Sequence, residues 1–208
     1  QAINNMIAHG SDPRGMTLMP AASPSRIIFS ASSGTGDRQA YSIDNQPTST
    51  AGRLAVSVEA RDPSNFTTMG LDKMFFTAHS EAAGRELWVT TGSGATQVVD
   101  LNPGAASSNP ADLIVFSGRL YFTADGPSGR ELYATDGTAV NTVLVHDLVP
   151  GESGSYPSVL TPFGGRLFFL ALDASSSRWL YSTDGATVSR GPAAPADART
   201  GVAMGATL

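Results

Sequence analysis

The sequence predicts an all-β fold made of four repeats, and three observations support this class. Short runs rich in Leu, Phe and Tyr recur four times at a step of about 47 residues. Each run is bounded by Gly, Pro and Asp residues that favour turns. No segment has the apolar spacing of three and four residues that is typical of an amphipathic helix. We therefore expect a β-propeller of four blades rather than a solenoid of helix pairs.

The clearest copy of the repeat lies at residues 119–151. Residues 119–124 and 131–135 are apolar runs separated by a loop of turn formers, so they predict a β-hairpin. An Asp-Gly pair follows, and this pair is favoured in tight hairpin turns. Residues 142–148 then predict a further strand, which ends at a Pro-Gly turn.

Each copy also has a short apolar run before the hairpin, which gives four strands per blade, the number typical of a propeller. The blade units are expected at residues 16–58, 66–101, 112–148 and 158–190, within a single domain of residues 1–208. In the first unit, residues 53–59 alternate between apolar and polar side chains. This alternation predicts a strand with one buried face.

The propeller is expected to close through terminal strands at residues 5–9 and 201–206. In one arrangement the opening segment, which resembles the strand at residues 142–148, supplies an outer strand to the last blade. In the other, the last strand comes from residues 187–189 or 201–206, and the opening residues form an arm. Closure would remove an open sheet edge.

Composition fits one globular domain and limits its partners. Hydrophobic residues make up 41% of the chain and charged residues 15%, which is enough apolar material for a core. The net charge of -5 argues against nucleic acid or an anionic membrane surface as partner. No apolar run reaches membrane-spanning length. Because there is no cysteine, disulfides and thiolate metal sites are excluded.

Three runs with the sequences ELWVTTG, ELYATDGT and WLYSTDG start at Glu86, Glu131 and Trp179. They resemble the signature of the ELWxxDGT-repeat proteins. Residues 100–104 and 147–151 are similar to the Asp-hydrophobic-x-Pro-Gly segment that accompanies this signature. The resemblance covers residues 66–185 well and the first 65 residues poorly.

The resemblance implies a propeller-like repeat in a bacterial secreted or surface protein, with no shared catalytic residues. The sequence departs from the pattern at Thr91, which replaces Asp, at Trp179, which replaces Glu, and at residues 39–41, which replace Glu-Leu-Trp. We expect the turns and blade edges at these places to differ in geometry.

Recurring aspartates are the candidates for a metal site. Asp136 and Asp184 occupy equivalent turns, and Asp100 and Asp147 precede the Pro-Gly turns. Calcium, the only cofactor considered, prefers six to eight oxygen ligands, but the spacing of a calcium-binding loop is absent. The favoured interpretation is that each aspartate caps its own turn.

No residue is assigned a catalytic role. No serine lies in a Gly-x-Ser-x-Gly elbow, and the histidines at positions 9, 79 and 146 lack metal-ligand spacing. Most aromatic residues lie on the central strands and are expected in the core. Tyr156 and Phe66, which are expected outside these strands, are therefore the candidate ligand contacts.

The sequence favours a non-enzymatic binding or structural module of an exported bacterial protein, including a self-assembling or adhesive one. Its expected partner is a protein or carbohydrate surface, or another copy of the chain through strand complementation. The alternative is a secreted hydrolase that acts on glycan or peptide at a propeller face. Turns and packing account for the recurring residues, which favours the first hypothesis, although propellers support many activities.

Overall fold

The computed structural model describes residues 12–20, 25–32, 37–44, 46, 51–56 and 60–193. These residues form 17 β-strands in four sheets, which confirms the predicted all-β class. In this part of the chain, no helix is long and apolar enough to cross a membrane.

The first two sheets are built from strands β1 to β9. The first sheet has the order β1-β2-β3-β4, with β1 (Arg14–Met19), β2 (Arg26–Ser32), β3 (Arg38–Asp44) and β4 (Gly52–Arg53). The second has the order β5-β9-β8-β7-β6, with β5 (Ala55–Val56), β6 (Arg61–Met69), β7 (Lys73–Ser80), β8 (Gly84–Thr90) and β9 (Gly94–Val99). The central pairs β2 with β3 and β7 with β8 are the predicted hairpins.

The last two sheets repeat this plan. The third has the order β10-β11-β12-β13, with β10 (Ala111–Phe116), β11 (Arg119–Gly126), β12 (Gly129–Thr135) and β13 (Val143–Leu144). The fourth has the order β14-β15-β16-β17, with β14 (Ser158–Phe163), β15 (Arg166–Leu172), β16 (Arg178–Thr183) and β17 (Val188–Ala193). Apart from the parallel pair β5 with β9, all strand pairs are antiparallel.

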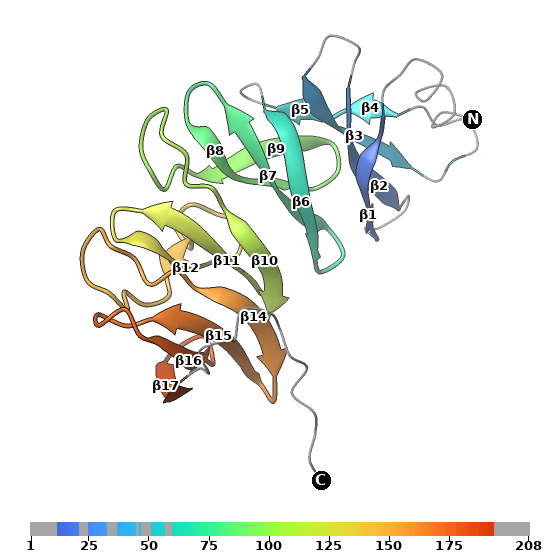
Figure 1. The fold of residues 1–208 in the computed structure, drawn as a ribbon. Helices are drawn as coiled ribbons and strands as arrows, with labels where there is room; N and C mark the ends of the chain where they lie inside the picture. The colour runs from blue at the N-terminus through green and yellow to red at the C-terminus, as the bar shows by residue number, and fades with distance from the viewer. Residues whose placement is uncertain are drawn as a thin grey trace.

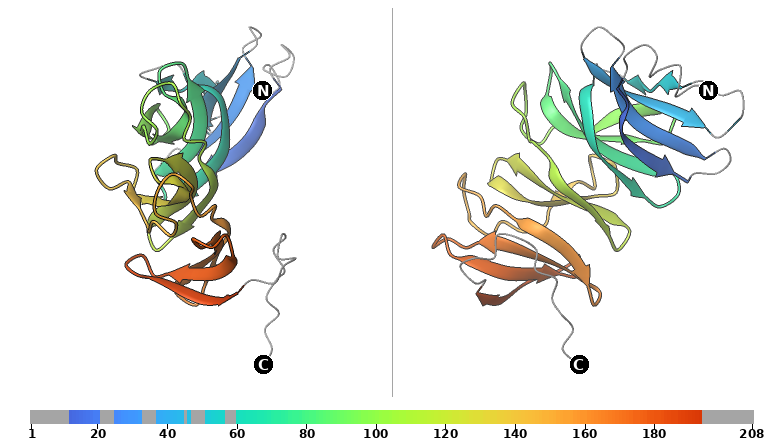
Figure 2. Two further views of the ribbon diagram at one scale, coloured as in Figure 1. Left: turned by 60° about the vertical axis from the view of Figure 1, so that its left-hand side comes forward. Right: turned by 45° about the vertical axis from the view of Figure 1, so that its right-hand side comes forward.

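The four sheets follow one another along an arc, with the first sheet at one end and the fourth at the other (Figure 1). Both views of Figure 2 show the same succession. The first strands β1, β6, β10 and β14 lie next to one another, because each contacts the next. This is a propeller-like arrangement. Among the described residues no strand pair joins the first sheet to the fourth, and the predicted closing strands at residues 5–9 and 201–206 lie outside these residues.

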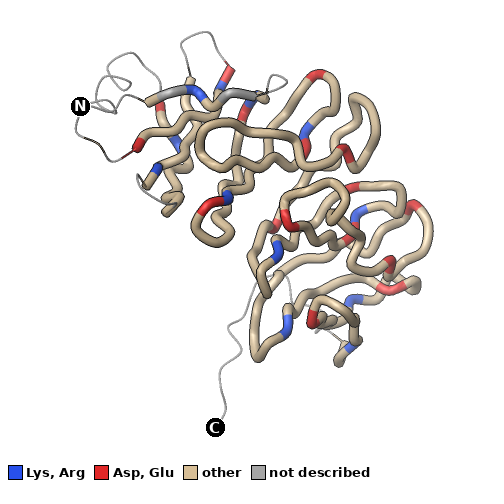
Figure 3. The backbone as a smooth tube through the Cα atoms, turned by 180° about the vertical axis from the view of Figure 1, so that it is seen from behind, with Lys and Arg blue, Asp and Glu red and all other residues tan. Residues whose placement is uncertain are grey.

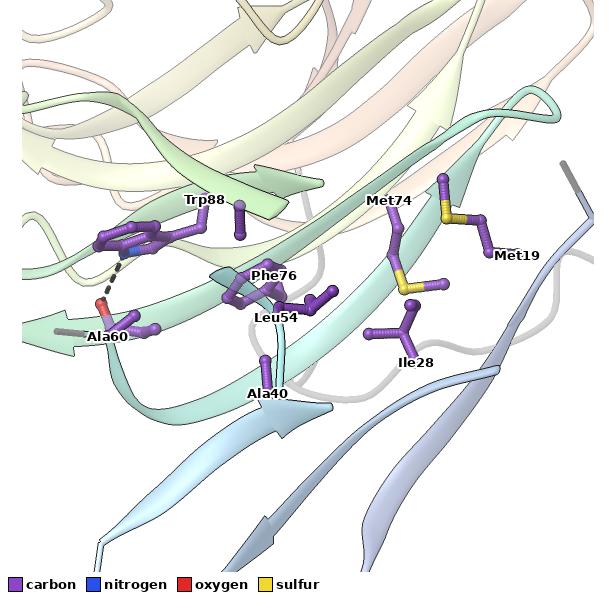
Figure 4. Close-up of a cluster of buried hydrophobic side chains, with 10 residues drawn as sticks. Met19, Ile28, Ala40, Leu54, Ala60, Met74, Phe76 and Trp88 are labelled. Carbon is purple, nitrogen blue, oxygen red and sulfur yellow. Dashed lines mark hydrogen bonds between the residues drawn. The ribbon is translucent and has the colours of Figure 1, made fainter. Parts of the chain in front are cut away.

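An apolar cluster fills each boundary between neighbouring sheets. Figure 4 shows the first cluster, in which Met74 of the second sheet lies beside Ile28 of the first and Trp88 lies at the other end of the cluster. Trp88 is fully buried, and its Nε1–H donates to the carbonyl of Ala78 at 3.2 Å. The buried indole therefore keeps a hydrogen-bond partner, as buried tryptophans usually do.

A stacked aromatic pair recurs on the two central strands of every sheet. The ring centroids lie 5.8–6.4 Å apart and the planes are 20–27° from parallel. The pairs are Phe29 with Tyr41, Phe76 with Trp88, Phe122 with Tyr133 and Phe169 with Tyr181. In the second, third and fourth sheets the pair belongs to the cluster shared with the preceding sheet, which confirms that these aromatics are core residues.

Two strands differ from the predicted repeat. Strand β5, expected to belong to the first unit, pairs parallel with β9 of the second sheet, because alternation predicts a strand but not its partner. The strand predicted at residues 142–148 is limited to β13, since the chain then turns into the connector to the next sheet. The last strand among the described residues, β17, overlaps the strand expected at residues 187–189, whereas residues 5–9 and 201–206 of the two closing arrangements lie outside the described residues.

Candidate functional site

Asp136 and Asp184 each bind within their own turn. The Asp136 carboxylate accepts the N–H and the hydroxyl of Thr138 at 2.9 and 2.7 Å and the side-chain amide of Asn141 at 2.7 Å. The Asp184 carboxylate accepts the N–H of Thr187 at 2.8 Å. These hydrogen bonds lower the pKa of both carboxyl groups to about 2. The geometry agrees with turn capping.

The other metal candidates, Asp100 and Asp147, lie in the connectors between sheets. Asp100 accepts the N–H groups of Asn102 and Gly104, each at 3.2 Å. In Asp147 the buried Oδ1 has no hydrogen-bond partner among the described residues. Among the described residues no group of three metal-binding side chains could hold an ion, and calcium stays the less favoured alternative to turn capping.

The recurring glutamate of the repeat anchors the connector to the next sheet. Glu86 is fully buried and accepts the N–H and the hydroxyl of Ser108 at 2.7 and 2.5 Å. Glu131, also fully buried, accepts the same two groups of Ser155 at 2.6 and 2.5 Å. The two pairs are repeat equivalents, and we call them the Glu–Ser latches.

Burial changes the acidity of both latches. Desolvation raises the pKa of Glu131 to about 7, although its hydrogen bonds to Ser155 oppose this shift, and the nearby charge of Asp147 adds to it. Desolvation also raises the pKa of Glu86. A raised carboxyl pKa is common at active sites, but here each carboxylate is hydrogen-bonded to the connector. The latches therefore serve the architecture.

An arginine at the start of the third strand holds the first strand of the same sheet. In three sheets its guanidinium donates to a backbone carbonyl at or just before the first strand. The pairs are Arg38 with Asp12 at 2.6 Å, Arg85 with Asp62 at 3.1 Å and Arg130 with Asn109 at 3.2 Å. The Arg-Glu dipeptides of the repeat thus join strands and connectors.

Each first strand carries a break in pairing register at this place, and two residues three positions apart take positive φ. The pairs are Asp12 and Gly15, Asp62 and Asn65, Asn109 and Asp112, and Tyr156 and Val159. We call these eight residues the bulge rim. Asp and Asn tolerate positive φ, whereas a β-branched residue such as Val159 is a true outlier, with φ of 56°. The rim residues differ between sheets, while the arginines behind them recur.

A cleft of about 530 Å³ opens on the bulge rim between β1 and β6. Its lining includes three arginines, Arg14 from β1, Arg38 from β3 and Arg85 from β8. Arg38 and Arg85 are fixed by their hydrogen bonds, whereas the side chain of Arg14 is 70% exposed and pairs with Asp12 at 2.6 Å. The cleft therefore combines pre-positioned donors with one accessible guanidinium.

Other side chains add polar groups to a lining that is largely apolar. Asp62, Ser64 and Asn65 contribute a carboxylate, a hydroxyl and an amide. Phe66 also lines the cleft and packs against Phe76 at a centroid distance of 5.5 Å. This arrangement offers several hydrogen-bonding groups beside one aromatic ring.

The two predicted ligand contacts lie in different sheets. Phe66 lies within β6, not outside the strands, and still lines the cleft. Tyr156 is on the bulge rim before β14 and is 51% exposed, but it does not line the cleft. The sequence analysis did not identify the three arginines, because nothing in the sequence links residues 14, 38 and 85. The recurrence of arginine before the third strand was the available signal.

Charged residues of both signs are spread over the four sheets in the part of the chain that the structure describes (Figure 3). At the cleft the balance is positive, since three arginines line it together with one carboxylate, that of Asp62. The neighbouring Asp12 pairs with Arg14 and Arg38, at 2.6 and 3.6 Å. A cleft of this kind attracts a partial or full negative charge.

No protein-family model matches the chain, and no curated protein matches its sequence. Solved structures are similar in fold. One comes from a study of two prolyl endopeptidases and has a TM-score of 0.51 at 14% identity, over 80% of this chain and 24% of that chain. This chain therefore spans about a quarter of the length of that protein.

Two further similar structures are glycoside hydrolases. Zg3597, a family 117 glycoside hydrolase of the marine bacterium Zobellia galactanivorans, has a TM-score of 0.38 at 10% identity, over 88% of this chain and 69% of that chain. The Bacteroides ovatus xyloglucan PUL GH43B has a TM-score of 0.38 at 12% identity, over 89% of this chain and 41% of that chain. At these identities the likeness concerns the fold alone.

Proposed function

We propose that this chain is a non-enzymatic binding module of an exported bacterial protein and that it binds carbohydrate in the cleft between β1 and β6. The observation that carries the proposal is the meeting of Arg14, Arg38 and Arg85 around a cleft of about 530 Å³. Its volume lies in the range of small-molecule sites, about 300–1,000 Å³. The exported, bacterial origin rests on the repeat motifs alone.

The lining chemistry favours a sugar that carries a carboxylate. A guanidinium presents a planar fork of N–H donors that matches a carboxylate, and it also donates to hydroxyl groups. Arg38 and Arg85 are already held by backbone carbonyls, so little side-chain freedom is lost when a ligand binds. Phe66 supplies an apolar surface beside these donors.

The test is calorimetric titration of the protein with acidic and neutral oligosaccharides. An acidic oligosaccharide should bind, and Arg14→Gln should weaken it about tenfold, a loss of about 1.4 kcal/mol. Arg53→Gln is the control, because Arg53 is exposed on β4 and does not line the cleft. The proposal is contradicted if no oligosaccharide binds, or if Arg14→Gln binds as tightly as the wild type.

The same titrations test the alternative, a secreted hydrolase of glycan or peptide. Glycosidic hydrolysis usually uses two carboxyl groups, and the cleft lining contains the carboxylate of Asp62. The expected result is therefore binding without product. Cleavage products that disappear in Asp62→Asn would favour the hydrolase instead.

A further inference from the structure

Arg14 has no counterpart in the other three sheets. It lies two residues after the first residue of the bulge rim in β1, and the equivalent positions of the other sheets hold Ser64, Ala111 and Ser158. All four residues pair with the second strand of their own sheet directly before the break in register. The repeat forms the same break without an arginine at this position. The architecture therefore does not account for Arg14.

The side chain of Asp12 occupies the guanidinium of Arg14. Oδ2 of Asp12 accepts from Nε of Arg14 at 2.8 Å and lies 2.6 Å from Nη2 of the same guanidinium. This oxygen also lies 3.6 Å from Nη1 of Arg38. A single oxygen thus faces both donors on one side of Arg14. The stronger arrangement is bidentate, in which each donor has an oxygen of its own.

The backbone limits how Asp12 can approach Arg14. Its carbonyl accepts from Nη2 of Arg38 at 2.6 Å, and its φ is 37°. The carboxylate is joined to this fixed backbone by a single methylene group, and Arg14 is only two residues away. A carboxylate that belongs to a ligand does not have this restriction. It can present both oxygens to Nε and Nη2 of Arg14, which matches the planar fork of the guanidinium.

We propose that the Asp12 carboxylate is a built-in competitor, which the carboxylate of an acidic oligosaccharide replaces at Arg14. This inference rests on the proposed function of the cleft. After the exchange the ligand holds both donors of Arg14, and Asp12 stays beside Arg38. A sugar hydroxyl is a weaker substitute, because a hydrogen bond to a neutral acceptor is about half as strong as one to a charged acceptor.

The exposure of the ion pair allows this exchange. The side chains of Arg14 and Asp12 are 70% and 56% exposed, so they can separate without disturbing the core. An exposed ion pair contributes at most about 1 kcal/mol, which corresponds to a factor of about five in affinity. Asp12 should therefore weaken binding of an acidic ligand about fivefold without preventing it.

The exchange also predicts how salt affects binding. In the wild type one ion pair breaks and one forms, so screening by salt has a small net effect. In Asp12→Asn the ligand forms an ion pair and none is broken. Binding to this variant should therefore weaken more steeply as salt is added.

The test is calorimetric titration of the full chain with an acidic oligosaccharide at low and high salt. Asp12→Asn should bind it about fivefold more tightly than the wild type at low salt, and with the steeper salt dependence. Asp72→Asn is the matched control, since it removes the same charge from an exposed residue in the turn between β6 and β7. It should bind as the wild type does. Melting temperatures will check that both variants fold.

The inference is wrong if Asp12→Asn binds no more tightly than the wild type, or if its salt dependence is unchanged. Weaker binding would also overturn it, because Asp12 would then orient Arg14 for the ligand. An equal gain in Asp72→Asn would mean that net charge alone matters. If the wild type binds and Asp12→Asn shows no gain, only this inference fails. If neither protein binds any oligosaccharide, the proposed function fails as well.

Discussion

Glu131 on β12 receives both the backbone N–H and the side-chain hydroxyl of Ser155, 24 residues further along the chain. Glu86 and Ser108 repeat this relationship one sheet earlier. In each latch the glutamate belongs to one sheet and the serine lies in the connector that leads to the next. The order of the sheets along the arc is therefore fixed by buried polar contacts as well as by apolar packing.

The Glu131 latch should make stability depend on pH. Its pKa is about 7 in the folded protein and near 4.5 in the unfolded chain, so folding favours the protonated form. The free energy of unfolding is then highest below pH 4.5 and should fall as pH rises toward and through 7, by about 3 kcal/mol for this group. Urea unfolding at a series of pH values measures this slope.

Glu131→Gln should flatten that dependence between pH 5 and 8, because glutamine does not titrate and can still accept from Ser155. Glu152→Gln, which alters an exposed carboxylate, is the control and should keep the wild-type slope. An unchanged slope in Glu131→Gln would show that the latch does not titrate in this window.

Alanine substitutions at Gly129 and Gly118 should distinguish the cost of backbone strain from the cost of a steric clash. Their φ angles are 73° and 74°, so alanine costs about 1–2 kcal/mol of backbone strain at either position. A Cβ at Gly129 would lie 2.5 Å from the backbone nitrogen of Gly154, whereas at Gly118 nothing lies within 4 Å. Gly129→Ala should thus lower the melting temperature far more than Gly118→Ala, and equal losses would contradict the packing argument.

Asp136 should support stability on the acid side of the pH range. Its pKa is about 2 in the folded protein against 3.8 ordinarily, because Thr138 and Asn141 donate to the carboxylate. This contribution is present above pH 3.8 and is lost as pH falls toward 2. Asp136→Asn should therefore reduce the fall in melting temperature between pH 4 and pH 2. A variant that loses stability equally with the wild type over this range would count against it.

The two tryptophans should respond differently to replacement. Trp88 is fully buried between the first two sheets, so Trp88→Leu should cost about 3 kcal/mol of unfolding free energy. Trp179 is half-buried, with the Arg190 guanidinium 3.8 Å from its ring centroid, so Trp179→Leu should cost about 1 kcal/mol. Chemical denaturation of both variants tests the ranking, which would be wrong if Trp179→Leu were the more damaging.

The fold could be predicted because the same pattern of apolar runs and turn residues occurs in several copies along the sequence. The hairpins of β7 with β8 and β11 with β12 follow from apolar runs bounded by turn residues, and each copy supports the others. Strand β5 was assigned to the wrong sheet because an alternating run defines a buried face but no pairing partner. The strand predicted at residues 142–148 was too long, because its apolar residues continue into the connector to the next sheet.

The candidate site was harder to predict than the fold. Phe66 was singled out, but the arginines that surround it come from β1, β3 and β8 of two different sheets. These arginines line one cleft only because the fold brings the three strands close together. The bulge rim was also missed, because Asp62 and Asn65 are common in ordinary turns, and a positive φ leaves no clear mark on a single sequence.

The Glu–Ser latches also constrain how a chain of this kind can change length. In each latch the glutamate lies on one sheet and the serine lies in the connector that leads to the next sheet, so adding or deleting a whole period leaves each latch glutamate with a serine. Insertion or deletion of part of a period would leave a buried carboxyl group without its hydrogen-bond partner, which costs free energy of folding. Insertions and deletions should therefore comprise complete repeats, because each latch joins two neighbouring repeats.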